Sequence, residues 1–133
     1  KGEDLDKFIP FYVKAKLQNC DNVVVYDNTI DESISSFMCR NMLVYAVHGD
    51  RDNIGNVVQK LTMMTGSKPD IVYMGHLHTN QYMTVYDTKV IQSGCISGSD
   101  SYCMDNRLRS KPEQAVSVIS DSGLECVYDV TLG

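Results

Sequence analysis

The chain has 133 residues, enough for one domain, and its 43% hydrophobic and 22% charged residues are typical of a globular protein rather than a disordered one. A formal net charge of −5 argues against a protein that coats DNA, although a local basic loop or bound metal ions could still meet a polyanion. Five cysteines include no Cys-x-x-Cys pair, which favours a reduced, cytoplasmic protein. Apolar runs stay well short of the roughly 18 residues that span a bilayer, so we expect no membrane partner.

The first third of the chain carries weak structural signals. Residues 4–18 have apolar side chains at three-to-four-residue spacing, which predicts an amphipathic helix that starts or kinks near Pro10 and offers a packing surface. Short runs at residues 23–26 and 34–37 predict two strands on either side of a turn at residues 27–28.

The middle of the chain predicts a βαβ unit. Residues 42–47 and residues 71–74 are continuous apolar runs, as expected of strands buried on both faces. Between them lies a helical pattern that Asp52 or Asn53 would cap and Gly66 would end. Strand, helix and strand in this order predict a right-handed unit with parallel strands. The apolar stripe of the predicted helix consists of Ile54, Val57, Val58, Leu61 and Met64.

The last third of the chain predicts antiparallel structure. Residues 81–92 form one expected hairpin around a turn at residues 87–88, and residues 115–130 form a second around residues 120–123. Residues 93–112 are rich in Gly, Ser, Asp and Asn, which predicts a long surface loop between the hairpins.

All three histidines of the chain follow directly on the predicted parallel strands. His48 comes after the first strand, and His76 and His78 come after the second. Ligands of an open α/β sheet bind beyond the carboxyl ends of its strands, so neighbouring strands would deliver these side chains to one edge. In an extended segment His76 and His78 would leave the same face, and Gly75 would permit a tight turn.

A histidine trio at one sheet edge is a candidate metal site. Any one of these histidines alone is better explained as a satisfied polar residue at a strand end. Together they favour a shared site, because imidazole nitrogen suits manganese, iron, zinc and similar ions. Neutral ligands leave the positive charge of a metal ion unbalanced. Asp50 and Asp52 are candidates to support the histidine ligands from behind, without binding the ion themselves.

Two motifs resemble a known family. Residues 47–50 read Val-His-Gly-Asp, and residues 73–78 read Tyr-Met-Gly-His-Leu-His. These two segments resemble the last two motifs of the calcineurin-like metallophosphoesterases. The loop that includes residues 93–100 and 110–114 is similar to that of phage- and prophage-encoded members. The resemblance covers roughly residues 35–133, and its first segment matches only weakly.

The resemblance implies a fold and an activity. The expected fold is an α/β two-sheet sandwich flanked by helices, of which residues 1–133 would form the C-terminal portion. The family hydrolyses phosphoesters with two divalent ions, here manganese, iron, zinc or nickel, that activate a bridging water. By the resemblance His48 and His76 would bind one ion and His78 the other. The implied activity is that of a phosphodiesterase or nuclease, with a phosphoester such as nucleic acid as substrate.

The family's earlier motifs are missing upstream of His48. These are Asp-x-His, Gly-Asp-x-x-Asp and Gly-Asn-His-Asp or Glu; residues 49–53 resemble the second but lie in the wrong order. Because Lys1 does not look like a natural start, we expect a fragment that is inactive alone and lacks the N-terminal half of its domain. A second copy of the chain could instead complete the site. The alternative is a metallophosphoesterase fold that has lost catalysis and serves as a binding or assembly module.

The predicted loop at residues 93–112 carries a short basic segment. Arg107 and Arg109, with Lys111 nearby, could bind a phosphate group. A short basic loop on an acidic protein is more often a solvated surface, so the two readings stay open.

Overall fold

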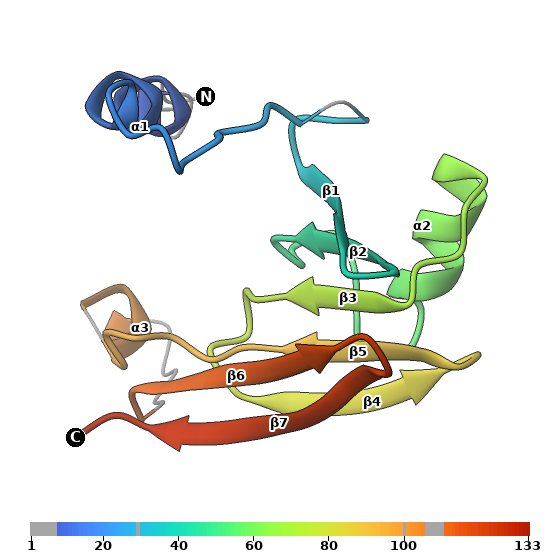
Figure 1. The fold of residues 1–133 in the computed structure, drawn as a ribbon. Coiled ribbons are helices and arrows are strands. Elements are labelled where there is room, and N and C mark those ends of the chain that lie inside the picture. The colour runs from blue at the N-terminus through green and yellow to red at the C-terminus, as the bar shows by residue number, and fades with distance from the viewer. Residues whose placement is uncertain (1–7, 29, 100, 106–110) are drawn as a thin grey trace.

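A computed structural model describes residues 8–28, 30–99, 101–105 and 111–133. Five strands form one mixed sheet in the order β1-β2-β3-β5-β4, and two more form a separate hairpin (Figure 1). The elements in chain order are α1 (Phe8–Leu17), β1 (Ile34–Cys39), β2 (Met42–Val47), α2 (Val57–Thr65), β3 (Ile71–Met74), β4 (Gln81–Val85), β5 (Thr88–Gln92), α3 (Ser101–Asp105), β6 (Glu113–Ser120) and β7 (Gly123–Thr131).

Parallel strands form the centre of the five-stranded sheet. β2 pairs in parallel with β3, which confirms the predicted pair of parallel strands, and β3 also pairs in parallel with β5. The edge strands β1 and β4 are antiparallel to their neighbours. We expected β5 only within an antiparallel hairpin, but it lies between β3 and β4. Val90 and Ile91 are fully buried there, which suits a strand that is covered on both faces.

Different layers cover the two faces of this sheet. Tyr45 and Val72 belong to one apolar cluster with Val58 of α2. Ile71 belongs to a second cluster with Leu124 of the β6–β7 hairpin, which lies along β5 and β4 (Figure 1). Because neighbouring residues of one strand enter opposite clusters, the central strands have no polar face. The two-sheet sandwich with a covering helix agrees with the predicted fold.

α2 begins later than the sequence predicted. Its N-cap residue is Asn56 rather than Asp52 or Asn53, and it makes no side-chain capping hydrogen bond. Asn53 instead accepts two backbone N–H groups of the preceding turn through Oδ1, each at 3.1 Å. Gly66 ends the helix with φ of 73°, as predicted. Met64 is exposed and does not belong to the buried stripe.

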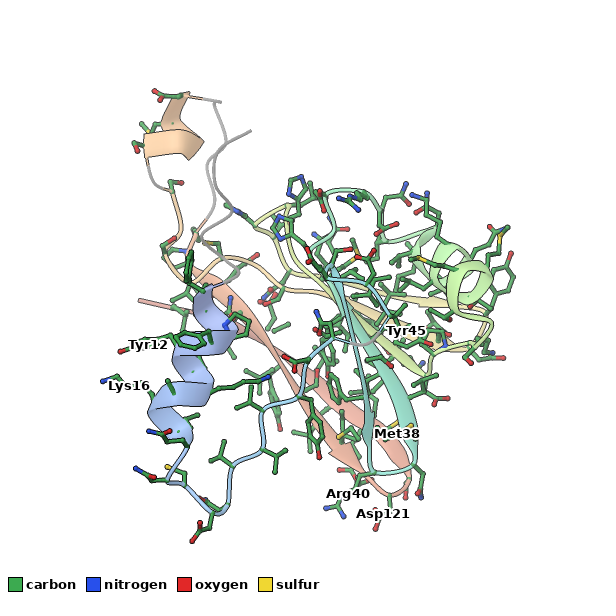
Figure 2. All side chains as sticks on the ribbon, turned by 90° about the horizontal axis from the view of Figure 1, so that it is seen from above. Tyr12, Lys16, Met38, Arg40, Tyr45 and Asp121 are labelled. Carbon is green, nitrogen blue, oxygen red and sulfur yellow. The ribbon has the colours of Figure 1, made fainter. Side chains whose placement is uncertain are left out.

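The N-terminal segment departs most from the prediction. α1 is a helix, but Phe8, Phe11 and Tyr12 are exposed, so these apolar side chains are not covered by a sheet. α1 stands apart from the sheets in Figure 1, and Tyr12 and Lys16 point away from them in Figure 2. Residues 23–26 are not a strand, because their backbone has no neighbouring strand with which to pair.

The first hairpin turn is formed by Tyr86 and Asp87, one residue earlier than predicted. Both residues have positive φ, 49° and 67°, as a type I′ turn requires, and Val85 pairs with Thr88 across it. The predicted loop at residues 93–112 contains the short helix α3. In the described part of the chain, no helix has the length and apolar character needed to cross a bilayer.

Candidate metal centre

β2 and β3 end side by side and bring two histidines together. Val47 and Met74, the last residues of these strands, are paired in register. Just beyond them, the backbone N–H of Gly75 donates to the carbonyl of His48 at 3.0 Å. His76 Nδ1 lies 3.3 Å from His48 Nε2, and the two rings meet edge to face at 72°. The expected convergence of His48 and His76 is therefore present, although 28 residues separate them.

Gly49 permits the close approach of the two histidine segments. Its φ is 100°, a conformation that L side chains rarely adopt. A Cβ atom at this position would lie 3.1 Å from Cε of Met74, 3.2 Å from the carbonyl oxygen of Gly75 and 3.5 Å from Cβ of His76. A larger residue would therefore be strained at this φ and would have to displace these neighbours by a few tenths of an ångström.

The segment that carries His76 and His78 is turned, not extended as predicted. His76 has φ of 73° and His78 has φ of 56°, both in the left-handed region. The Leu77 N–H donates to the Gly75 carbonyl at 3.0 Å, which fits a γ-turn centred on His76. Residues other than glycine adopt such conformations at a cost of about 1–3 kcal/mol and are concentrated at functional sites. The turn is made by a histidine rather than by Gly75.

The distance between the two imidazoles fits a shared metal ion. Two nitrogens that bind one tetrahedral ion, each at about 2.0–2.1 Å, are separated by about 3.3–3.4 Å. The 3.3 Å between His48 Nε2 and His76 Nδ1 matches this separation and is long for a direct hydrogen bond. Both side chains are exposed, so an ion could reach them from solvent.

A complete set of metal ligands is not present in the described part of the chain. Within it, no group of three His, Cys, Asp or Glu side chains is placed to hold one ion. His78 is half-buried and does not join His48 and His76 in such a group. Its role as a ligand stays a prediction.

The predicted supporting residues have separate positions. Asp50 is exposed and lies 3.8 Å from Nε of Arg51. Asp52 is largely buried and pairs with Lys60 of α2 at 3.2 Å. Asp52 therefore links the loop after β2 to α2. Its predicted support of the histidine ligands stays a prediction. Arg107 and Arg109 lie outside the described residues.

No pattern in the sequence predicted a cleft beside His48. A cavity of about 180 Å³ opens between the loop after β2, the start of β1 and α2, and His48 is part of its lining. Asp31 also lines it, and hydrogen bonds from the hydroxyl and the N–H of Ser33 hold the pKa of Asp31 below its usual value. The Asp-x-Ser spacing is an Asx-turn signal that could have identified this carboxylate before the structure was known.

Known proteins resemble this chain in sequence and in fold. No protein-family model matches the chain. The chain is 27% identical over 137 residues to the SPbeta prophage-derived uncharacterized protein YonJ of Bacillus subtilis (strain 168), across 98% of this chain and 33% of YonJ. Vps29 of Entamoeba histolytica, crystallised with Zn²⁺, matches with a TM-score of 0.56 and 17% identity over 75% of this chain and 59% of Vps29. An archaeal phosphodiesterase matches with a TM-score of 0.51 and 17% identity, over 75% of this chain and 51% of that protein.

These structural matches confirm the predicted fold class. The chain shares its α/β two-sheet sandwich fold with Vps29 and the archaeal phosphodiesterase. The prophage origin of YonJ agrees with the resemblance of the loop at residues 93–114 to phage-encoded proteins. The chain spans one third of this curated relative and between half and three fifths of the two solved structures.

Proposed function

We propose that this chain supplies histidine ligands to the metal centre of a phosphoesterase, most specifically a phosphodiesterase or nuclease. The observation that carries the proposal is the 3.3 Å separation of His48 Nε2 and His76 Nδ1 at the carboxyl ends of adjacent parallel strands. The matches to a phosphodiesterase and to a zinc complex of Vps29 support it.

The remaining ligands would come from residues outside this chain. Two neutral imidazoles cannot balance the charge of a divalent ion, and the described residues contain no group of three ligands. The N-terminal part of the same domain or a second copy of the chain would add carboxylates. His78 would serve a second ion, and this chain alone would then be inactive.

The chain's own residues would fix the geometry of the ligands. Gly49 keeps the strand ends close, and the γ-turn aims His76 at His48. Divalent ions bound there, such as manganese, iron, zinc or nickel, would neutralise phosphate charge and generate hydroxide near neutral pH.

Hydrolysis by the intact protein tests this proposal. A protein that includes the segment preceding this chain should hydrolyse bis-p-nitrophenyl phosphate or DNA when Mn²⁺ is added. The His76→Ala variant should lose most of this activity while its melting temperature changes little, because His76 is exposed. If the intact protein hydrolyses neither compound in the presence of Mn²⁺, the enzymatic proposal is wrong.

A second proposal is an inactive binding or assembly module. It is favoured by the exposed apolar side chains of α1, among them Phe8 and Phe11, which could contact another polypeptide. On this proposal the intact protein would bind a protein partner through α1 and would show no metal-dependent hydrolysis. Substitution of Phe11 by Ser should then weaken partner binding, whereas His76→Ala should not.

A further inference from the structure

The loop that carries His76 and His78 passes the end of β5. This β3–β4 loop leaves β3 after Met74 and enters β4 at Gln81, and both of these residues pair in register with Gln92. β5 lies between β3 and β4 in the sheet (Figure 1), and Gln92 is its last residue. Gln92 is therefore the strand residue that lies between the two ends of the loop.

Gln92 contacts this loop through its side-chain amide. Its Nε2 donates to the backbone carbonyl of Thr79 at 2.9 Å and lies 3.3 Å from the Thr79 hydroxyl. A carbonyl oxygen only accepts hydrogen bonds, so the amide nitrogen has to face Thr79. Gln92 is fully buried, and its Oε1 has no hydrogen-bond partner among the residues that the structure describes. An apolar side chain of similar length would leave no buried acceptor unpaired, so the benefit of an amide here lies in its bond to Thr79.

Asn80 links the end of the same loop to the β6–β7 hairpin. Its backbone N–H donates to Oε1 of Glu113 at 2.5 Å, and its side-chain Nδ2 donates to the carboxylate of Asp129. Its Oδ1 accepts the N–H of Gly94 at 2.7 Å. Asn80 therefore joins the β3–β4 loop to both strands of the hairpin and to the segment after β5.

The β3–β4 loop needs such support because its backbone is strained. His76 and His78 have left-handed φ values of 73° and 56°, and residues other than glycine keep such conformations only where their surroundings hold them. The side chain of Leu77 is 55% exposed, so its burial does not hold the loop. The hydrogen bonds of Gln92 and Asn80 supply the constraint at the end of the loop.

We propose that Gln92 and Asn80 are positioning residues, whose hydrogen bonds fix the β3–β4 loop in the conformation that keeps the His76 ring beside His48. The inference rests on the proposed function, because a shared ion needs the 3.3 Å separation of the two ring nitrogens. Loss of residues that orient metal-binding histidines typically weakens metal binding by about 10–100-fold. Loss of either residue should therefore weaken the binding of an ion by this pair of histidines.

Zn²⁺ titration of this chain, followed by the NMR signals of the histidine rings, tests the inference. Gln92→Met should weaken Zn²⁺ binding at His48 and His76 about tenfold or more. In the metal-free chain it should also weaken the nuclear Overhauser effect between the two rings, whose centroids are 5.1 Å apart. The matched control is Thr88→Val: Thr88 is also fully buried, and its hydroxyl donates to the Pro69 carbonyl at 2.5 Å at the opposite end of β5. This control should lower the melting temperature but leave Zn²⁺ affinity and the ring contact unchanged.

Asn80→Ala is a second test that does not depend on the folding of Gln92→Met, because Asn80 is only half-buried. It should weaken Zn²⁺ binding and the contact of the two rings in the same way. Its matched control is Gln114→Ala at the same junction. The Gln114 amide donates to the carbonyls of Gly94 and Glu113 at 2.6 and 2.9 Å instead of to the β3–β4 loop, so its loss should leave both measurements unchanged.

The outcomes separate this inference from the proposed function. A ring contact that is unchanged in Gln92→Met and Asn80→Ala, or that weakens equally in the control variants, would overturn the positioning role. If the chain still binds Zn²⁺ at His48 and His76 in that case, the metal proposal stays in place. If the unmodified chain binds no Zn²⁺ at these histidines, while the ring contact weakens only in Gln92→Met and Asn80→Ala, the positioning role stands and the metal proposal is wrong.

Discussion

Substitution of Gly49 by alanine should strain the strand ends that carry the two histidines. At φ of 100° an alanine costs about 1–3 kcal/mol in backbone energy. Its Cβ would also lie 3.2 Å from the carbonyl oxygen of Gly75, and backbone atoms yield less readily than the flexible end of Met74. Displacement of packed neighbours adds about 1–2 kcal/mol, so the free energy of unfolding should fall by about 2–5 kcal/mol.

Gly66 provides a matched control for this substitution. Its φ is 73°, so alanine there has a similar backbone cost of about 1–2 kcal/mol, but its Cβ would meet no atom within 4 Å. The difference between Gly49→Ala and Gly66→Ala therefore measures the close contact. For a chain of this size, we expect Gly49→Ala to lower the melting temperature by about 4–8 °C more than Gly66→Ala does.

Thermal unfolding followed by circular dichroism measures the two variants. An NMR spectrum of the histidine rings should also show altered His48 and His76 signals in Gly49→Ala, and unaltered ones in Gly66→Ala. Equal melting temperatures together with unchanged histidine signals would refute the argument that Gly49 is needed for the close approach of His48 and His76.

Two further predictions concern the loops around the cleft. Lys60→Met should lower the free energy of unfolding by about 1–2 kcal/mol in urea denaturation, because it leaves the largely buried Asp52 unpaired. The loss stays small because Lys60 itself is half exposed. An equal loss in Arg40→Met, which breaks the exposed pair of Arg40 with Asp121, would contradict this. Ser33→Ala should raise the pKa of Asp31 toward its usual value in a carboxyl NMR titration. Because the folded-state pKa is lowered, the stabilisation by Asp31 is present above the unfolded value of about 3.9 and is lost as the pH falls through the folded pKa. An unchanged Asp31 titration in Ser33→Ala would exclude the Ser33 hydroxyl as the cause.

The centre of the fold could be predicted because its signals are local. The apolar runs that became β2 and β3, with Gly66 between them, defined a βαβ unit from composition and spacing alone. Parallel neighbours must end at one edge, which was sufficient to place His48 beside His76.

Features that depend on distant partners could not be predicted. β5 joins β3 because sheet order is decided by long-range packing, which no local pattern records. Residues 23–26 have the composition of a strand but lack a partner. The left-handed φ of His76 is uncommon for a residue other than glycine, and no local sequence pattern predicted it.

Mn²⁺ titration of this chain, followed by paramagnetic line broadening, tests the claim that His48 and His76 share an ion. Broadening should begin at the rings of these two histidines and should disappear there in both His48→Ala and His76→Ala. The Asp121→Asn variant, altered at an exposed carboxylate paired with Arg40 away from the site, should behave as the unmodified chain does. Broadening that centres on acidic loops, or that survives both histidine substitutions, would contradict the metal site.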